Sequence, residues 1–513
     1  NSTLSKACIR GHTSPATKIV IMDLGFVKDG DSTLMFTLTP PQTKDAGIEV
    51  SKGCYCFVID VSGSMNTPAE VTTDDGDRVS HGWSQLDISK HACNTIVSSL
   101  DENDYVAVIT YSDSAKVILE WSRCDAGGKL HAMATIDSMR PERSTNLMAG
   151  LVTGLDMMKK VPGSDDMLQK LSLNLIVCTD GMPSPQWHPA RGRDGYAPLV
   201  GMLIKKLVAA RGAAARPQIT TIGLGGQLDS ELLMGFSDSF LHMPDPGSVG
   251  PFMVNMLAAQ RCTARLPDLA GPAANDASLL LSPRSAVAEV PGYKLHGKEA
   301  KTATGEDALR LPLGAIRYDQ PRHVVIDLKH PISSGIAITA TIELHGKAAF
   351  TATSEGATAA AAPELVEAEK VRLKCADFLD GLAKASRSTG DVASHPPPPD
   401  AALLRAYLDY VAAGPAAQLD AVAALLDTMR GQVLLGLGEE HWAKWGVHYC
   451  RTLPLMLRSE RRSNFRDRAL QHFGRDAAGR EAMFEDESSA AEMTFATLKA
   501  PEPSLLQPQA PVG

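Results

Sequence analysis

The chain has 513 residues and a formal net charge of −9 at pH 7, with 44% hydrophobic and 21% charged residues. This length predicts several domains with sizeable cores, and the composition excludes a chain that is disordered throughout. The acidic balance argues against nucleic acid or an anionic membrane as the main partner. The sequence contains no run of 18 apolar residues, so it predicts no membrane-spanning helix.

The nine cysteines are odd in number and scattered, and no C-x-x-C pair occurs. This usage argues against a disulfide framework or a zinc ribbon and favours a reducing compartment. We therefore expect a cytoplasmic (intracellular) protein, with an extracellular location as the alternative.

A β-hairpin is predicted at the start of the chain. Residues 18–24 and 33–39 are rich in strand-forming residues, and Lys28-Asp29-Gly30-Asp31 between them is typical of a turn. Because an isolated hairpin is only marginally stable in water, we expect the segment 1–52 to pair with a later β-module.

Strands and helices alternate over residues 53–262, which predicts a doubly wound, mainly parallel α/β domain. Strands are predicted from short apolar runs at 54–60, 105–111, 116–121, 173–179, 218–223 and 239–243. Helices are predicted from apolar residues at helical spacing over 88–100, 147–158, 199–208 and 249–259.

The pattern returns to strands over residues 263–356, where apolar residues alternate at period two and Pro and Gly are frequent. The predicted fold class is thus an α/β domain (Rossmann-like) inserted in a β-sandwich. Residues 363–499 predict an α-helical domain, in which Pro454 should kink or end the last helix over 439–458. Residues 500–513 predict an extended, Pro-rich tail.

Oxygen-bearing side chains gather at the carboxyl ends of two predicted strands and at one helix start. Asp60, Ser62 and Ser64 follow the first strand, Asp180 follows a later one, and Thr145 precedes a helix. Ligands of open α/β sheets bind at this edge, and oxygen donors suit a hard divalent cation. Because three of these five donors are neutral, a bound ion would seek a carboxylate from outside the chain.

The pattern D-x-S-x-S alone is more typical of a turn or helix cap. Its combination with a buried strand before it, T-D-G after a later strand and S-T-N-L at a helix start favours a metal site.

These segments resemble the von Willebrand factor type A domain. The resemblance rests on Val58-Ile59-Asp60-Val61-Ser62-Gly63-Ser64-Met65, Ser144-Thr145-Asn146-Leu147 and Cys178-Thr179-Asp180-Gly181. It covers about residues 53–262 and implies a metal-ion-dependent adhesion site for Mg²⁺, with Mn²⁺ or Ca²⁺ as alternatives. It further implies Ser62, Ser64 and Thr145 as direct ligands, and Asp60 and Asp180 as ligands that act through water. Arg143-Ser144 stands where the family often has a glycine.

The flanking segments are similar to intracellular eukaryotic proteins in which such a domain is followed by a β-sandwich and a helical C-terminal region. The resemblance rests on Leu313-Gly314-Ala315-Ile316-Arg317-Tyr318 and Trp445-Gly446-Val447-His448-Tyr449. Some members of that group are linked to ubiquitin transfer.

The predicted function is a non-enzymatic, divalent-metal-dependent protein-binding or scaffold protein, whose partner supplies an acidic residue and which can form part of a larger complex. One alternative is the substrate-recruiting part of a ubiquitin ligase. Another is a Mg²⁺-dependent hydrolase or phosphatase, which is disfavoured because Ser62 replaces the second carboxylate of a D-x-D motif and no G-x-S-x-G elbow is present.

Overall fold

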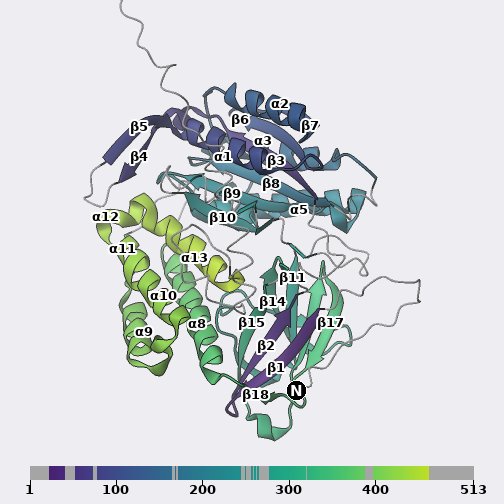
Figure 1. The fold of residues 1–513 in the computed structure, drawn as a ribbon, viewed down its shortest axis with the longest axis vertical. Helices are drawn as coiled ribbons and strands as arrows, with labels where there is room; N and C mark the ends of the chain where they lie inside the picture. The colour runs from purple at the N-terminus through teal and green to yellow at the C-terminus, as the bar shows by residue number, and fades with distance from the viewer. Residues whose placement is uncertain are drawn as a thin grey trace, which may run out of the picture.

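The computed structural model describes residues 22–40, 52–72, 78–164, 168, 171–243, 276–318, 320–387 and 397–460, with scattered positions between 249 and 264. Three parts are visible: an α/β part, a β-sandwich, and a helical part that lies beside both (Figure 1). None of the helices within these ranges is long and apolar enough to cross a bilayer.

A six-stranded sheet in the order β10-β9-β8-β3-β6-β7 forms the centre of the α/β part. Its strands are β3 (Lys52–Asp60), β6 (Tyr105–Tyr111), β7 (Ala115–Arg123), β8 (Leu171–Thr179), β9 (Gln218–Leu224) and β10 (Ser239–Met243). All neighbours pair in parallel except β6 and β7. Every residue of β8 is buried, as expected for a parallel strand covered on both faces.

Helices cover both faces of this sheet, and the side chains of β3 alternate between the two cores. The helices are α1 (Gln85–Ser99), α2 (Ala126–Asp137), α3 (Leu147–Lys159), α5 (Tyr196–Arg211) and α6 (Ser230–Phe236). Phe57 packs in the core beneath α1 and α2, whereas Cys54 and Cys56 pack in the core beneath α3 and α5. These cysteines are therefore core residues. The helix expected over 249–259 falls mostly outside the described residues, although its described positions are helical.

Two five-stranded sheets form the β-sandwich, in the orders β12-β15-β2-β1-β18 and β13-β14-β11-β16-β17. The N-terminal strands are β1 (Asp23–Asp29) and β2 (Thr33–Thr39), joined at Gly30 with a φ of 64°. The later strands are β11 (Ala277–Ser282), β12 (Val287–Glu289), β13 (Lys298–Lys301), β14 (Asp307–Gly314), β15 (Arg322–Leu328), β16 (Thr339–Leu344), β17 (Lys347–Thr353) and β18 (Thr358–Ala359).

The N-terminal hairpin completes the sandwich, because β2 pairs antiparallel with β15 and β1 pairs parallel with β18. Phe36 of β2 shares one apolar core with Leu279 of β11 and Val325 of β15. The α/β part is thus an insertion into the β-sandwich, and the predicted fold class is confirmed.

The helical part is less regular than its sequence pattern suggests. It contains α8 (Pro363–Ala385), α9 (Ala402–Ala413), α10 (Asp420–Thr428), α11 (Leu434–Gly436), α12 (Glu439–His441) and α13 (Val447–Ser459). π-Helical turns interrupt the helices at Met429–Val433 and at Trp442–Gly446, the second of them within the helix expected over 439–458. Pro454 lies inside α13, which continues to Ser459, so it does not end the helix. Residues 461–499 and the tail 500–513 lie outside the described residues.

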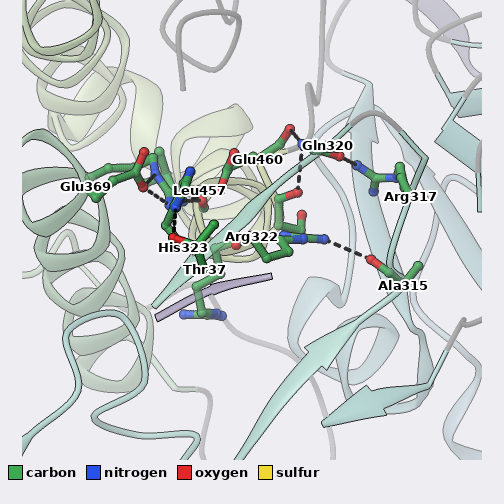
Figure 2. Close-up of polar contacts among 12 residues, drawn as sticks. Thr37, Ala315, Arg317, Gln320, Arg322, His323, Glu369, Leu457 and Glu460 are labelled. Carbon is green, nitrogen blue, oxygen red and sulfur yellow. Dashed lines mark hydrogen bonds and ion pairs between the residues drawn. The ribbon is translucent and has the colours of Figure 1, made fainter. Parts of the chain in front are cut away.

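A buried ionic cluster attaches the β-sandwich to the helical part (Figure 2). Arg372 of α8 is completely buried and pairs with Glu369 and with Glu460, the latter at 3.1 Å. Arg322 of β15 donates to the carbonyl oxygen of Arg458 at 2.9 Å, and Gln320 donates to that of Glu460 at 2.6 Å. The end of α13 is therefore held by side chains from both parts.

A second set of buried contacts attaches α13 to the α/β part. The two ring nitrogens of His448 lie 2.8 Å from the Ser230 hydroxyl and 3.0 Å from the Gly226 carbonyl oxygen. Arg451 donates to the same hydroxyl at 2.9 Å and to the carbonyl oxygen of Ser386 at 2.8 Å. A single helix thus contacts all three parts of the chain.

We expect R372A to lower the free energy of unfolding by about 3–5 kcal/mol, because Glu369 and Glu460 would stay buried without their cation. The matched control is R430A, which breaks the more exposed pair of Arg430 and Asp409 and should cost less than about 1 kcal/mol. Urea denaturation followed by circular dichroism measures both, and equal losses would contradict the structural importance of the cluster.

Candidate metal centre

Asp60 ends β3 and is completely buried, and three donors fix its carboxylate. One oxygen accepts a hydrogen bond from the Ser62 amide at 2.8 Å. The other accepts from the Thr179 hydroxyl at 2.7 Å and the Tyr111 hydroxyl at 3.3 Å. Since β6 and β8 both pair in parallel with β3, the strand ends themselves bring these groups together.

Two serines connect Asp60 to Asp180. The hydroxyls of Ser62 and Ser64 lie 3.0 Å apart, and the Ser64 hydroxyl donates to Asp180 at 3.0 Å. Ser64 is exposed in the short 3₁₀ turn Gly63–Asn66, whereas Ser62 and Asp180 are buried. The cluster therefore faces solvent on the side of Ser64.

Backbone hydrogen bonds hold Thr145 at the edge of the sheet where Asp60 and Asp180 lie. The Gly63 amide donates to the Arg143 carbonyl oxygen at 3.0 Å, which holds the loop before Thr145 against the serine turn. Thr145 is also held to Ser184, which accepts from its amide at 3.2 Å and donates to its carbonyl oxygen at 3.0 Å. Hydrogen bonds thus join Asp60, Ser62, Ser64 and Asp180 in one chain, in which the backbone amide of Ser62 is the link to Asp60, while Thr145 is positioned by its loop.

The electrostatics of the cluster favour a cation. Burial raises the pKa of Asp60 above its ordinary range. Burial, with the charge of Asp60 as the second cause, raises the pKa of Asp180 to about 7. A cation beside two buried acids of like charge would offset the cost of their ionisation.

The donor set matches a hard metal ion rather than a soft one. All five candidate side chains offer oxygen, which suits Mg²⁺, Mn²⁺ or Ca²⁺, whereas structural zinc sites use thiolate and imidazole. Within the described ranges, no three His, Cys, Asp or Glu side chains gather so as to hold a metal. The two carboxylates and the two serine hydroxyls, with Thr145 on the adjoining loop, thus fit a divalent cation of the hard class.

Four residues that support the cluster are not among those predicted from the sequence. Tyr111 and Thr179 bind the Asp60 carboxylate, Ser184 binds the Thr145 backbone, and Asp113 accepts from the Ser144 amide at 3.1 Å. Thr179 and Tyr111 end the strands that flank Asp60, so the predicted ends of the strands at 105–111 and 173–179 were the available signal. The links through Ser184 and Asp113 depend on loop conformation, which strand and helix patterns do not specify.

Residues 55–182 match the family model of the von Willebrand factor type A domain. The chain therefore contains a von Willebrand factor type A domain. The matched segment contains all five candidate metal ligands, and domains of this family generally mediate protein interactions.

One solved structure shows a similar fold over most of the chain. A von Willebrand factor type A protein from Catenulispora acidiphila matches with a TM-score of 0.50 and 13% identity, over 86% of this chain and 98% of its own. The ArnB paralog VWA2 from Sulfolobus acidocaldarius matches with a TM-score of 0.41 and 11% identity, over 87% of this chain and 98% of its own. No curated protein sequence matches the chain.

We expect T179V to weaken divalent-metal binding by about 10- to 100-fold, because the Asp60 carboxylate would lose its shortest hydrogen bond. The matched control is T221V, which makes the same change at a buried threonine of β9 whose hydroxyl lies near Ser237. Calorimetric titration with Mn²⁺ measures both affinities. Equal affinities for T179V and the native chain would contradict a role for Thr179 in orienting Asp60.

Proposed function

We propose that this chain is a non-enzymatic protein-binding or scaffold protein that captures partners through a divalent cation, Mg²⁺ in the first instance. The observation that carries the proposal is the chain of hydrogen bonds from Asp60 through Ser62 and Ser64 to Asp180, with Ser64 exposed. An ion held there would be reached from solvent rather than enclosed by protein.

The roles of the ligands follow from what each side chain already binds. Both oxygens of Asp60 accept hydrogen bonds from neighbouring groups, which supports a role for this acid through water. Ser62, Ser64 and Thr145 would then be direct ligands, and Asp180 would supply the second negative charge. When bound, the cation would act as a Lewis acid. Most of its direct ligands from the chain would be neutral hydroxyls, so an acidic side chain of a partner would complete its coordination.

The environments of two histidines, the residue type that most often serves as a general base, support a non-enzymatic role. His448 is buried and both ring nitrogens have hydrogen-bond partners. The His91 ring packs against Trp83, with ring centroids 5.5 Å apart. A phosphatase would require a general acid or base at the metal, and Mg²⁺-dependent turnover of p-nitrophenyl phosphate would overturn this part of the proposal.

Mg²⁺ should raise the melting temperature of the native chain, and D180N should remove that response, because an ion that binds only the folded state stabilises it. D180N should also abolish Mg²⁺-dependent partner capture in a pulldown followed by mass spectrometry, while the circular dichroism spectrum stays native. The matched control is D156N, which changes an exposed acid of α3 that pairs with Lys159. Capture that survives in EDTA or in D180N would contradict the proposal.

A further inference from the structure

The loop that follows Asp180 carries a half-exposed tryptophan. Trp187 ends the short 3₁₀ turn Pro185–Trp187, and 38% of its surface is exposed. Large aromatic side chains at such positions are the residues that most often dominate protein interfaces. Trp187 is not a candidate metal ligand, so its exposed ring points to a role in contacting a partner.

Hydrogen bonds hold Trp187 in place beside the ligand loop. Its indole nitrogen donates to the Ser144 hydroxyl at 3.2 Å, and its amide donates to the Ser184 carbonyl oxygen at 3.0 Å. The Ser144 hydroxyl in turn donates to the Asp113 carboxylate. The one polar atom of the ring thus has its hydrogen-bond partner within the chain. Because the ring is already held in place, little conformational entropy is lost when a partner packs on its apolar face.

This tryptophan lies close to the ion that the ligands would hold. Ser144, which it contacts, is the residue before Thr145, and consecutive Cα atoms are about 3.8 Å apart. Ser184, at the base of the same turn, is bonded to the Thr145 backbone in both directions. A partner side chain that reaches the metal would therefore bring its neighbours to the ring.

The charge next to Trp187 favours an acidic partner. Arg143 precedes Ser144 and is exposed. Both nearby acids are already engaged within the chain: Glu142 by Lys116 at 2.6 Å and by the Ser112 hydroxyl at 2.5 Å, and Asp113 by the amide and hydroxyl of Ser144. An exposed arginine thus stands next in sequence to the serine that holds the ring, and the arginine and the ring complement a segment that is acidic and apolar.

We propose that Trp187 determines partner specificity, and that the partner is an extended acidic segment with a large apolar side chain two residues from its metal-binding Asp or Glu. In an extended segment, residues i and i+2 point to the same side, about 6.6 Å apart. One of them then reaches the cation while the other packs on the indole ring. This inference rests on the proposed function and adds to it the class of peptide that the site selects.

Selection from a phage-displayed library of random dodecapeptides on the full chain in Mg²⁺ tests this inference. The expected peptides bind in Mg²⁺, are lost in EDTA, and carry Asp or Glu with Leu, Ile, Phe, Tyr or Trp two positions away. Selection on W187A should keep the acid and lose the apolar residue. Y410A is the matched control, because Tyr410 is an exposed aromatic residue on α9, in the helical part.

The best selected peptide should bind W187A about tenfold or more weakly than the native chain and Y410A. The melting-temperature response of W187A to Mg²⁺ should remain, which separates loss of a peptide contact from loss of the metal. If that response disappears, Trp187 supports the metal site rather than selecting partners, and the inference is overturned.

The two proposals fail in different ways. Acidic peptides without an apolar neighbour, or an apolar preference unchanged in W187A, would overturn the role of Trp187 and leave metal-dependent binding intact. If the native chain selects no Mg²⁺-dependent peptide and Mg²⁺ does not change its melting temperature, both proposals are overturned. If only the peptides are missing, the specificity proposal alone is overturned.

Discussion

Two buried carboxylates meet at the ends of neighbouring parallel strands, and the organisation of the site depends on this constraint. The pairing of β3 with β8 fixes where Asp60 and Asp180 leave the sheet, whatever the loops do afterwards. Both acids are buried, and the charge of Asp60 raises the cost of ionising Asp180. The serine turn, the Thr179 and Tyr111 hydroxyls and the Thr145 loop are all placed around this pair, as a cation site would require.

The helical part packs against the α/β part and helps to fix its position. Residues of the sheet face beneath α1 share one continuous apolar core with the helical part, including Trp442. α13 contributes His448 and Arg451 to the α/β part, and its end is fixed by the buried Arg372 cluster. The helical part is thus integral to the core, and variants in it should be interpreted first through stability.

Much of the fold could be predicted from the sequence because its strands are continuous apolar runs. The core strand ending at Asp60 and the pairing of the N-terminal hairpin with β15 follow from burial and from the instability of an isolated hairpin. α2 could not be predicted, since Gly127 and Gly128 disfavour a helix, and its start depends on the Asp125 side chain, which accepts from the Gly128 amide. The π-helical turns likewise have no signal in an apolar stripe.

The candidate site, too, could be predicted only in part from the sequence. The five candidate ligands stand in motifs that can be read from the sequence, and these assignments stay predictions. The contacts around them join residues far apart in the chain: Thr179 and Asp60 are 119 positions apart, and Tyr111 and Asp60 are 51 apart. Pairings of this kind depend on the three-dimensional arrangement of strands and helices, which a single sequence does not specify.

A crystal of the full chain soaked in Mn²⁺ tests the central claim most directly, because anomalous scattering locates the metal itself. We predict one strong peak within about 2.0–2.6 Å of the hydroxyl oxygens of Ser62, Ser64 and Thr145, the range of bonds from hard divalent cations to oxygen. An open coordination position should face solvent beside Ser64. No peak at this edge of the sheet, or a metal fully enclosed by side chains of the chain, would contradict the account.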